Sequence, residues 1–308
     1  MNLEPVSQTQ LFGLNNFLLE FIDLYNNRKL PNKILLSGDK GVGKSTLAYH
    51  LVNFVLSKDE NCSYDINNFK IDPNNKSFKL IINKTNPNFT LVDITNEKNS
   101  IDINQIRELI SNLNKSSFNN KSRFVLIDNI EFLNINSMNA LLKIIEEPPE
   151  NTYFILINNN RKILPTLKSR CLNFKIFLPH KSSLKVINKI LDDDIGQYMN
   201  KDLLNYYFTP GNIYRLIKFA SLNDYDLKDY DLKNFLKLII KENLYRKNSA
   251  IKNIFFDSLE LFFRKNYSLV NSKIIDYSYF LKRISDTRKF NLDEESLFME
   301  FEYKLLNG

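Results

Sequence analysis

The alternation of apolar and polar residues changes character near residue 178. Before that point, short apolar runs alternate with amphipathic stretches. The run 124–127, Phe-Val-Leu-Ile, has the uninterrupted apolar character of a strand that is buried on both faces. Ile103, Ile106 and Ile110 recur at the spacing of one helical face and predict a helix. Residues 1–178 are therefore predicted to form an α/β domain around a parallel sheet.

Beyond residue 178 the pattern predicts helices. Leu184, Ile187 and Leu191 lie at helical spacing, and the polar stretch 221–233 is predicted to be a linker. Phe235 then opens a series of amphipathic segments. The predicted division is 1–178 for the α/β domain, 179–222 for a small helical domain and 234–308 for an all-helical C-terminal domain.

A glycine-rich loop follows the first predicted strand, residues 33–37. Residues 38–45 read Gly-Asp-Lys-Gly-Val-Gly-Lys-Ser, which fits the phosphate-binding P-loop. Gly38, Gly41 and Gly43 allow a tight turn that points backbone N–H groups at phosphate oxygens, and the next helix adds the positive end of its dipole. Because strand, loop and helix come in this order, the loop predicts a nucleotide site rather than a plain turn.

The side chains around these glycines are those that bind a magnesium nucleotide. Lys44 is placed to reach the β- and γ-phosphates, and Thr46 continues the binding segment into the helix. Ser45 and Asp128, which follows the apolar run 124–127, are expected to hold Mg²⁺. ATP with Mg²⁺ is therefore the expected cofactor.

The residue after Asp128 bears on hydrolysis. ATPases of this broad class usually place a glutamate there, which polarises the attacking water, whereas this chain has Asn129. An amide cannot accept the proton. Glu131 is an alternative base, and a solvated carboxylate in the turn is its other interpretation. We therefore expect ATP hydrolysis by this chain alone to be weak or absent.

Two further segments carry a family signature. Residues 139–149 read Asn-Ala-Leu-Leu-Lys-Ile-Ile-Glu-Glu-Pro-Pro, and residues 164–171 read Leu-Pro-Thr-Leu-Lys-Ser-Arg-Cys. Together with the P-loop and Asp128, they resemble the clamp-loader branch of the AAA+ ATPases, most closely the delta-prime family of bacterial DNA polymerase III. The resemblance covers about residues 5–222. It implies an AAA+ P-loop domain followed by a helical lid and a helical collar.

The resemblance also implies roles for three residues outside the P-loop. Arg170 would be an arginine finger, which acts in trans by stabilising charge on a γ-phosphate held by a neighbouring subunit. By itself, an Arg at this place would equally suit a helix C-terminal cap. Asn158, after the predicted strand 153–157, corresponds to a first sensor residue. Arg215 lies one residue beyond the second sensor position of the motor subunits, and an exposed helical Arg is its other interpretation.

The implied function is that of a stator in DNA replication. The chain would work as part of the DNA polymerase III holoenzyme with gamma/tau and delta subunits, the sliding clamp and primed DNA. An active gamma/tau-type ATPase is the alternative, against which Asn129 stands. An unrelated P-loop enzyme, such as a small-molecule kinase, would leave the segments 139–149 and 164–171 unexplained.

The segment after the P-loop helix separates these alternatives further. Motor subunits of the family carry a four-cysteine zinc module there, whereas Cys62 is the only cysteine between residues 57 and 90. One thiol cannot build a tetrahedral zinc site, so no zinc is expected. Residues 65–84 are rich in Asn, Lys, Asp and Ser, and we expect them to form a polar loop.

Charge and cysteine usage add little to this picture. A formal net charge of +7 permits contact with DNA phosphates, but lysine and asparagine are spread along the whole chain. DNA contact is therefore expected only as part of a loader. The two cysteines give no disulfide framework, and no apolar run approaches the ~20 residues of a membrane span. A cytoplasmic protein is expected.

Overall fold

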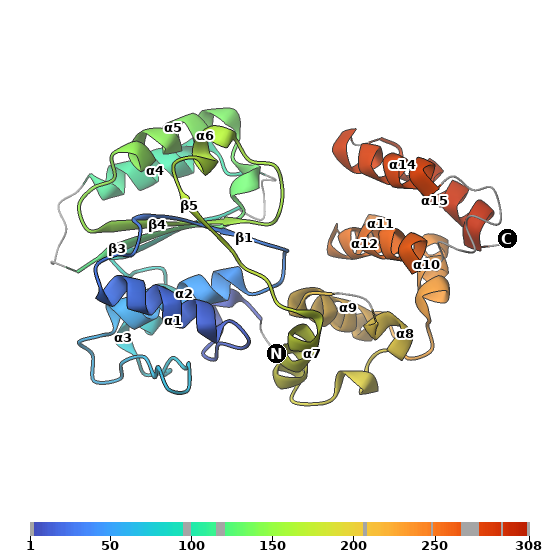
Figure 1. Cartoon of the computed structure of the whole chain (residues 1–308), viewed down its shortest axis with the longest axis horizontal. Helices are drawn as coiled ribbons and strands as arrows, with labels where there is room; N and C mark the ends of the chain where they lie inside the picture. The colour runs from blue at the N-terminus through green and yellow to red at the C-terminus, as the bar shows by residue number, and fades with distance from the viewer. Residues whose placement is uncertain are drawn as a thin grey trace. The chain divides into compact units, whose positions relative to one another are not determined.

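The computed structural model describes residues 3–94, 100–114, 121–205, 208–247, 249–265, 277–290 and 292–306. The chain divides into two compact units, Met1–Val186 and Ile187–Gly308, and each is described by itself. Figure 1 shows that the first unit contains a sheet between layers of helices, whereas the second is helical. The predicted α/β fold class with a helical C-terminal region is confirmed.

The first unit is built on one parallel sheet of five strands in the order β2-β3-β4-β1-β5. Strand β3 is the buried strand that the sequence predicts, since residues 124–127 are at most 1% exposed. Loops at the carboxyl ends of parallel strands meet at one edge of the sheet. The strands are β1 (Lys33–Ser37), β2 (Phe89–Val92), β3 (Arg123–Ile127), β4 (Thr152–Asn158) and β5 (Leu172–Lys175).

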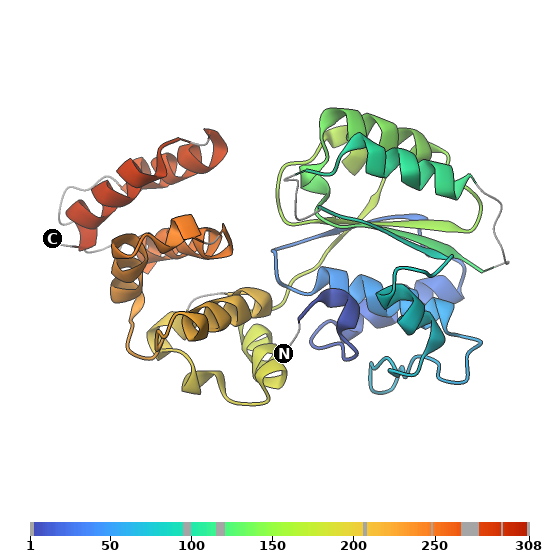
Figure 2. The ribbon, with the colours of Figure 1, turned by 180° about the vertical axis from the view of Figure 1, so that it is seen from behind.

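Helices cover both faces of this sheet, as Figures 1 and 2 show from opposite sides. One face carries α1 (Asn15–Asn26), α2 (Lys44–Leu56) and α3 (Lys76–Ile82), and the other carries α4 (Ile103–Leu113), α5 (Ile135–Glu146) and α6 (Pro165–Lys168). The predicted helix around Ile106 is α4, and Asp102 and Gln105 form a capping box at its start. Leu141 and Ile145 of α5 join one buried cluster with Val125 and Phe154 of the sheet.

The segment after α2 is partly helical, so the expectation of a polar loop over residues 65–84 is wrong for α3. Two polar residues hold this helix in place. Asn75 caps it, accepting from the Phe78 N–H and binding the Cys62 carbonyl through its amide nitrogen. The Glu60 carboxylate accepts from both the backbone N–H and the hydroxyl of Ser77. Burial of Phe78 and Ile81 completes the helix, because its apolar face packs inward.

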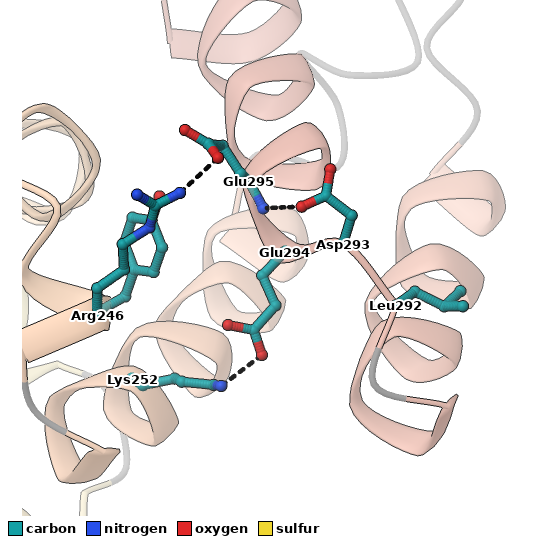
Figure 3. Close-up of a pocket in the computed structure, with 7 residues that line it drawn as sticks. Arg246, Lys252, Leu292, Asp293, Glu294 and Glu295 are labelled. Carbon is teal, nitrogen blue, oxygen red and sulfur yellow. Dashed lines mark hydrogen bonds and ion pairs between the residues drawn. The ribbon is translucent and has the colours of Figure 1, made fainter.

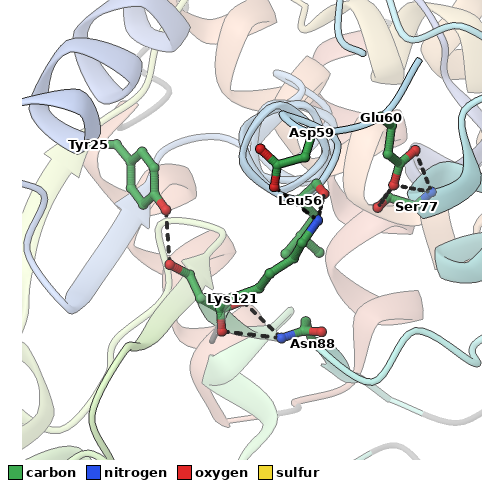
Figure 4. A network of polar contacts seen from close by, with 8 residues as sticks. Tyr25, Leu56, Asp59, Glu60, Ser77, Asn88 and Lys121 are labelled. Atoms are coloured by element: carbon green, nitrogen blue, oxygen red, sulfur yellow. Dashed lines mark hydrogen bonds and ion pairs between the residues drawn. The ribbon is translucent and has the colours of Figure 1, made fainter. Parts of the chain in front are cut away.

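A second set of polar contacts fixes the chain before β3 (Figure 4). The Lys121 ammonium lies 3.4 Å from the Leu56 carbonyl at the end of α2 and 3.4 Å from the Asp59 carboxylate. The Ser122 hydroxyl is hydrogen-bonded to the Tyr25 hydroxyl of α1 at 2.9 Å. The Asn88 amide donates to the carbonyls of Lys121 and Ser122, so it joins the approach to β2 with that to β3.

His50 is a buried neutral histidine in α2. Its Nε2 lies 3.2 Å from the Gln8 carbonyl, which can only accept, so Nε2 carries the proton and Nδ1 accepts from the Tyr64 hydroxyl at 2.8 Å. Burial lowers the pKa of His50 to about 4, against a smaller upward effect of the Gln8 carbonyl.

A pH-dependent loss of stability follows from His50. The unfolded chain takes up a proton near pH 6.5, whereas folded His50 stays neutral down to about pH 4, so stability from this site falls as the pH is lowered between these values. The stability advantage of wild type over His50→Gln should shrink by about 3 kcal/mol across that window. Paired urea unfolding at pH 7 and pH 4 measures it. A difference between the two proteins that does not change with pH would contradict this account of His50.

The second unit consists of helices. Phe298 is fully buried there, with its ring centroid 4.6 Å from that of Tyr245 and 4.7 Å from that of Phe255. The division into a lid at 179–222 and a collar at 234–308 stays a prediction. No helix within the described ranges is long and apolar enough to cross a membrane. The helices are α7 (His180–Leu191, shared with the first unit), α8 (Lys201–Leu204), α9 (Pro210–Leu222), α10 (Leu232–Lys241), α11 (Leu244–Lys247), α12 (Ser249–Lys265), α14 (Tyr277–Phe290) and α15 (Glu294–Phe301).

Ion pairs hold the start of α15 against two other helices of this unit (Figure 3). Lys252 of α12 lies 2.5 Å from Glu294, and Arg246 of α11 pairs with Glu295. Asp293 caps α15 by accepting from the Glu295 N–H. These charges line a shallow polar pocket, and because they are partly exposed, each pair adds little to stability.

Candidate functional site

The P-loop joins β1 to α2 at the carboxyl edge of the sheet. Gly41 and Gly43 have positive φ angles of 89° and 102°, which only glycine adopts without strain. Gly38 has no room for a side chain, because a Cβ there would lie 2.1 Å from the Ile176 carbonyl oxygen. The three predicted glycines thus meet backbone requirements of this loop.

Lys44 is buried at the start of α2, with 3% of its surface exposed. Its ammonium donates to the carbonyls of Gly38 and Asp39, each at 2.8 Å. Burial lowers its pKa to about 8, although the carboxylates of Asp128 and Glu131 act in the opposite direction. The ammonium is therefore hydrogen-bonded to the backbone of the loop that would bind phosphates.

Ser45 and Asp128 are brought together as the sequence predicts. The Ser45 hydroxyl donates to Asp128 Oδ2 at 2.5 Å, across a sequence separation of 83 residues. Burial raises the pKa of Asp128 to about 6, and the neighbouring Asp93 acts in the same direction. A hydroxyl and a carboxylate are oxygen donors that suit Mg²⁺, so the residues present fit a magnesium nucleotide. Thr46 is half-buried in the first turn of α2.

Asn129 lies at the centre of a network of amides and carboxylates. It has a left-handed φ of 56°, and its amide nitrogen donates to Asp93 Oδ1 at 2.7 Å. Its amide oxygen accepts from Asn159 at 2.9 Å. The Asn159 amide also donates to Glu131 at 2.9 Å. Both polar ends of the Asn129 amide are therefore hydrogen-bonded, and Glu131 is held by Asn159, the residue that follows β4, rather than simply solvated.

Asp93 and Asn159 are site residues that the predicted set did not include. Each directly follows a strand, β2 and β4 respectively, and these two strands flank β3. Polar residues at the carboxyl ends of neighbouring parallel strands meet at one edge, so their position after a strand was the available signal. The order of the strands, which brings them to Asn129, does not follow from that signal.

Asn158 and its neighbours shape the loop after β4. The Asn158 amide donates to the Arg161 carbonyl at 2.9 Å, and its oxygen accepts from the Arg161 N–H at 3.0 Å. Asn160 donates to Asp39 of the P-loop at 2.6 Å. The side chain of Asn158 is thus used within its own loop, and its role as a sensor stays a prediction.

Arg170 and Arg215 lie in different units. Arg170 follows α6 and is partly exposed. Its guanidinium binds the Glu146 carboxylate and the Thr166 carbonyl, so it makes no contact with the pair Ser45 and Asp128. Arg215 lies in α9, where its guanidinium donates to Asn212 Oδ1 at 3.2 Å and burial lowers its pKa. The proposed contact of Arg215 with nucleotide stays a prediction.

Neither cysteine forms a disulfide, and burial raises the pKa of the Cys171 thiol to about 11. Within the described ranges, no three His, Cys, Asp or Glu side chains gather as a candidate metal site. Asn75 and Glu60 hold the segment around Cys62 by hydrogen bonds.

Known proteins resemble this chain over most of its length. A family model described as "DNA polymerase III, delta subunit" matches residues 14–179, more than half of the chain. The DNA polymerase III subunit delta′ of Buchnera aphidicola subsp. Schizaphis graminum is 28% identical over 82% of this chain and 78% of its own length. The delta′ subunit of Buchnera aphidicola subsp. Acyrthosiphon pisum is 27% identical over 84% and 80%, respectively.

A subunit of another name matches a shorter stretch. The DNA polymerase III subunit gamma of Buchnera aphidicola subsp. Schizaphis graminum is 31% identical over 56% of this chain and 45% of its own length. The resemblance that the segments 139–149 and 164–171 indicated is thus confirmed. The chain belongs to the DNA polymerase III delta subunit family.

Proposed function

We propose that this protein is a delta-prime-type subunit of a clamp loader, a stator that offers Arg170 to the nucleotide site of a neighbouring ATPase. The observation that carries the proposal is the presence and hydrogen bonding of Asn129 directly after Asp128. It stands where a catalytic glutamate is expected, and both polar ends of its amide are hydrogen-bonded. Family membership and the delta′ relatives support the same reading.

The protein's own P-loop would serve binding rather than turnover. Lys44 would hold the β- and γ-phosphates, while Ser45 and Asp128 would hold Mg²⁺. Bound Mg²⁺ would neutralise phosphate charge. Without a base at position 129 to take a proton from water, the nucleotide would stay intact and would stabilise the loop that holds it.

Arg170 would act on a different nucleotide. Its guanidinium would stabilise charge on the γ-phosphate of a gamma/tau subunit, with delta, the sliding clamp and primed DNA as further members of the assembly. The side chain of Arg170 is 36% exposed, so a neighbour can reach it. DNA contact belongs to this assembly in the proposal.

An active gamma/tau-type ATPase is the second candidate. The observation in its favour is Glu131, a carboxylate that Asn159 holds by a 2.9 Å hydrogen bond beside Asn129. If Glu131 took the proton from water, the chain would hydrolyse ATP alone.

ATP hydrolysis by the purified chain, alone and mixed with gamma/tau and delta subunits, clamp and primed DNA, separates the two candidates. The stator predicts no turnover alone and turnover in the mixture. Turnover alone that Glu131→Gln removes would overturn the stator and establish an ATPase in its own right. Glu108→Gln, on α4, serves as a matched control for a change of glutamate to glutamine.

A further inference from the structure

The guanidinium of Arg170 is held by its own chain. Its Nε and Nη2 both donate to Glu146 Oε1, at 2.9 and 2.6 Å, and its Nη1 donates to the Thr166 carbonyl at 2.9 Å. A guanidinium has five N–H groups. These contacts use three of them, so one N–H on each terminal nitrogen stays available to a ligand.

Both ends of this ion pair are anchored in the core. Glu146 is the last residue of α5 and directly follows the buried Ile145. Arg170 follows α6, whose Leu167 is buried. Ile145 and Leu167 are each 0% exposed and belong to one buried cluster. The positions of the two charged side chains are therefore set by packed helices, even though the side chains themselves are partly exposed.

We propose that Glu146 is a positioning residue for Arg170, orienting its guanidinium toward the γ-phosphate of the neighbouring subunit. The inference rests on the function proposed above. A carboxylate on the Nε edge fixes the plane of the guanidinium and leaves one N–H on each terminal nitrogen for phosphate oxygens, which bind Arg in a two-pronged manner.

The gain is one of pre-organisation. An unrestrained Arg side chain loses much rotamer freedom when it is fixed against phosphate, whereas Arg170 is already fixed by Glu146 and the Thr166 carbonyl. Glu146 is half-exposed, so solvent screens its charge, and its effect on the phosphate itself is small. Orientation therefore outweighs the loss of net positive charge.

The test is the steady-state ATPase of the full assembly with Glu146→Gln in place of the wild-type chain. Glutamine keeps the size of the side chain and weakens its hold on the guanidinium. We expect kcat to fall roughly 10-fold with KM for ATP unchanged, because a misplaced finger slows the chemical step without changing nucleotide binding. In an Arg170→Ala background, Glu146→Gln should cause no further loss, which a merely structural role would not predict.

Glu147→Gln is the matched control, because Glu147 is the exposed neighbour in the same segment, and it should leave kcat unchanged. Co-elution with the partner subunits checks that each variant assembles. Wild-type kcat for Glu146→Gln, with Arg170→Ala inactive, would overturn this inference alone, as would losses that add in the double variant. A rise in kcat for Glu146→Gln would also overturn it, because Glu146 would then hold Arg170 away from its productive position. No effect of Arg170→Ala would overturn both proposals.

Discussion

Replacing Arg170 by Ala is expected to lower ATP turnover of the assembled clamp loader by about 10³-fold or more, the effect of removing an arginine finger. The guanidinium would stabilise charge that develops on the γ-phosphate of the neighbour, and alanine offers no replacement. The loss should appear in kcat. Steady-state hydrolysis with gamma/tau, delta, clamp and primed DNA measures it.

Lys168→Ala is the control for this change. Lys168 is a cation at the end of α6, close in sequence to Arg170, and its removal should leave turnover near wild type. Arg170 is partly exposed and Glu146 is its only charged partner within the described ranges, so Arg170→Ala should assemble normally. Equal losses from the two variants would indicate a general need for positive charge rather than a finger.

Gly38→Ala is expected to be the most destabilising single change in the P-loop. A Cβ at this position would lie 2.1 Å from the Ile176 carbonyl oxygen, which is backbone and cannot turn aside. The neighbouring strands cannot move apart easily, because backbone hydrogen bonds join them. The Gly38 N–H donates to the Asn158 carbonyl at 3.2 Å, and the Ile176 N–H donates to the Ser37 carbonyl at 2.7 Å. We expect a loss of about 3 kcal/mol or more.

A loss of that size lowers the midpoint of thermal unfolding by about 6 to 12 °C for a unit of this length. Gly196→Ala is the comparison, since the atoms that a Cβ there would meet belong to the Asp194 side chain, the nearest being its Oδ1 at 3.0 Å. It should unfold close to wild type. If Gly38→Ala matched it, the close approach of the loop to Ile176 would not constrain the fold.

Local sequence patterns predicted the parts of the fold that local forces decide. The apolar run 124–127 predicted a strand because its short length and β-branched residues suit a strand covered on both faces, and the P-loop forms because its glycines meet backbone angles that other residues avoid. Ser45 and Asp128 were paired correctly because motif order implies their meeting.

The contacts that sequence reasoning missed are long-range. The site around Asn129 depends on Asp93 and Asn159, and their meeting requires β2 and β4 to flank β3, which no local pattern states. Helix α3 was read as loop because it is short and lies in a stretch rich in polar residues, and the Glu60 carboxylate that holds it lies 17 residues before Ser77. Such pairings depend on how elements that are distant in the sequence pack together.

The most direct test of the stator compares Lys44→Ala with Arg170→Ala in the same assembled loader, by rate of ATP hydrolysis. Lys44 belongs to this protein's own nucleotide site, whereas Arg170 is proposed to serve a neighbour's. The account predicts little change for Lys44→Ala and a loss of about 10³-fold for Arg170→Ala. Comparable losses from both, or a loss from Lys44→Ala alone, would contradict it.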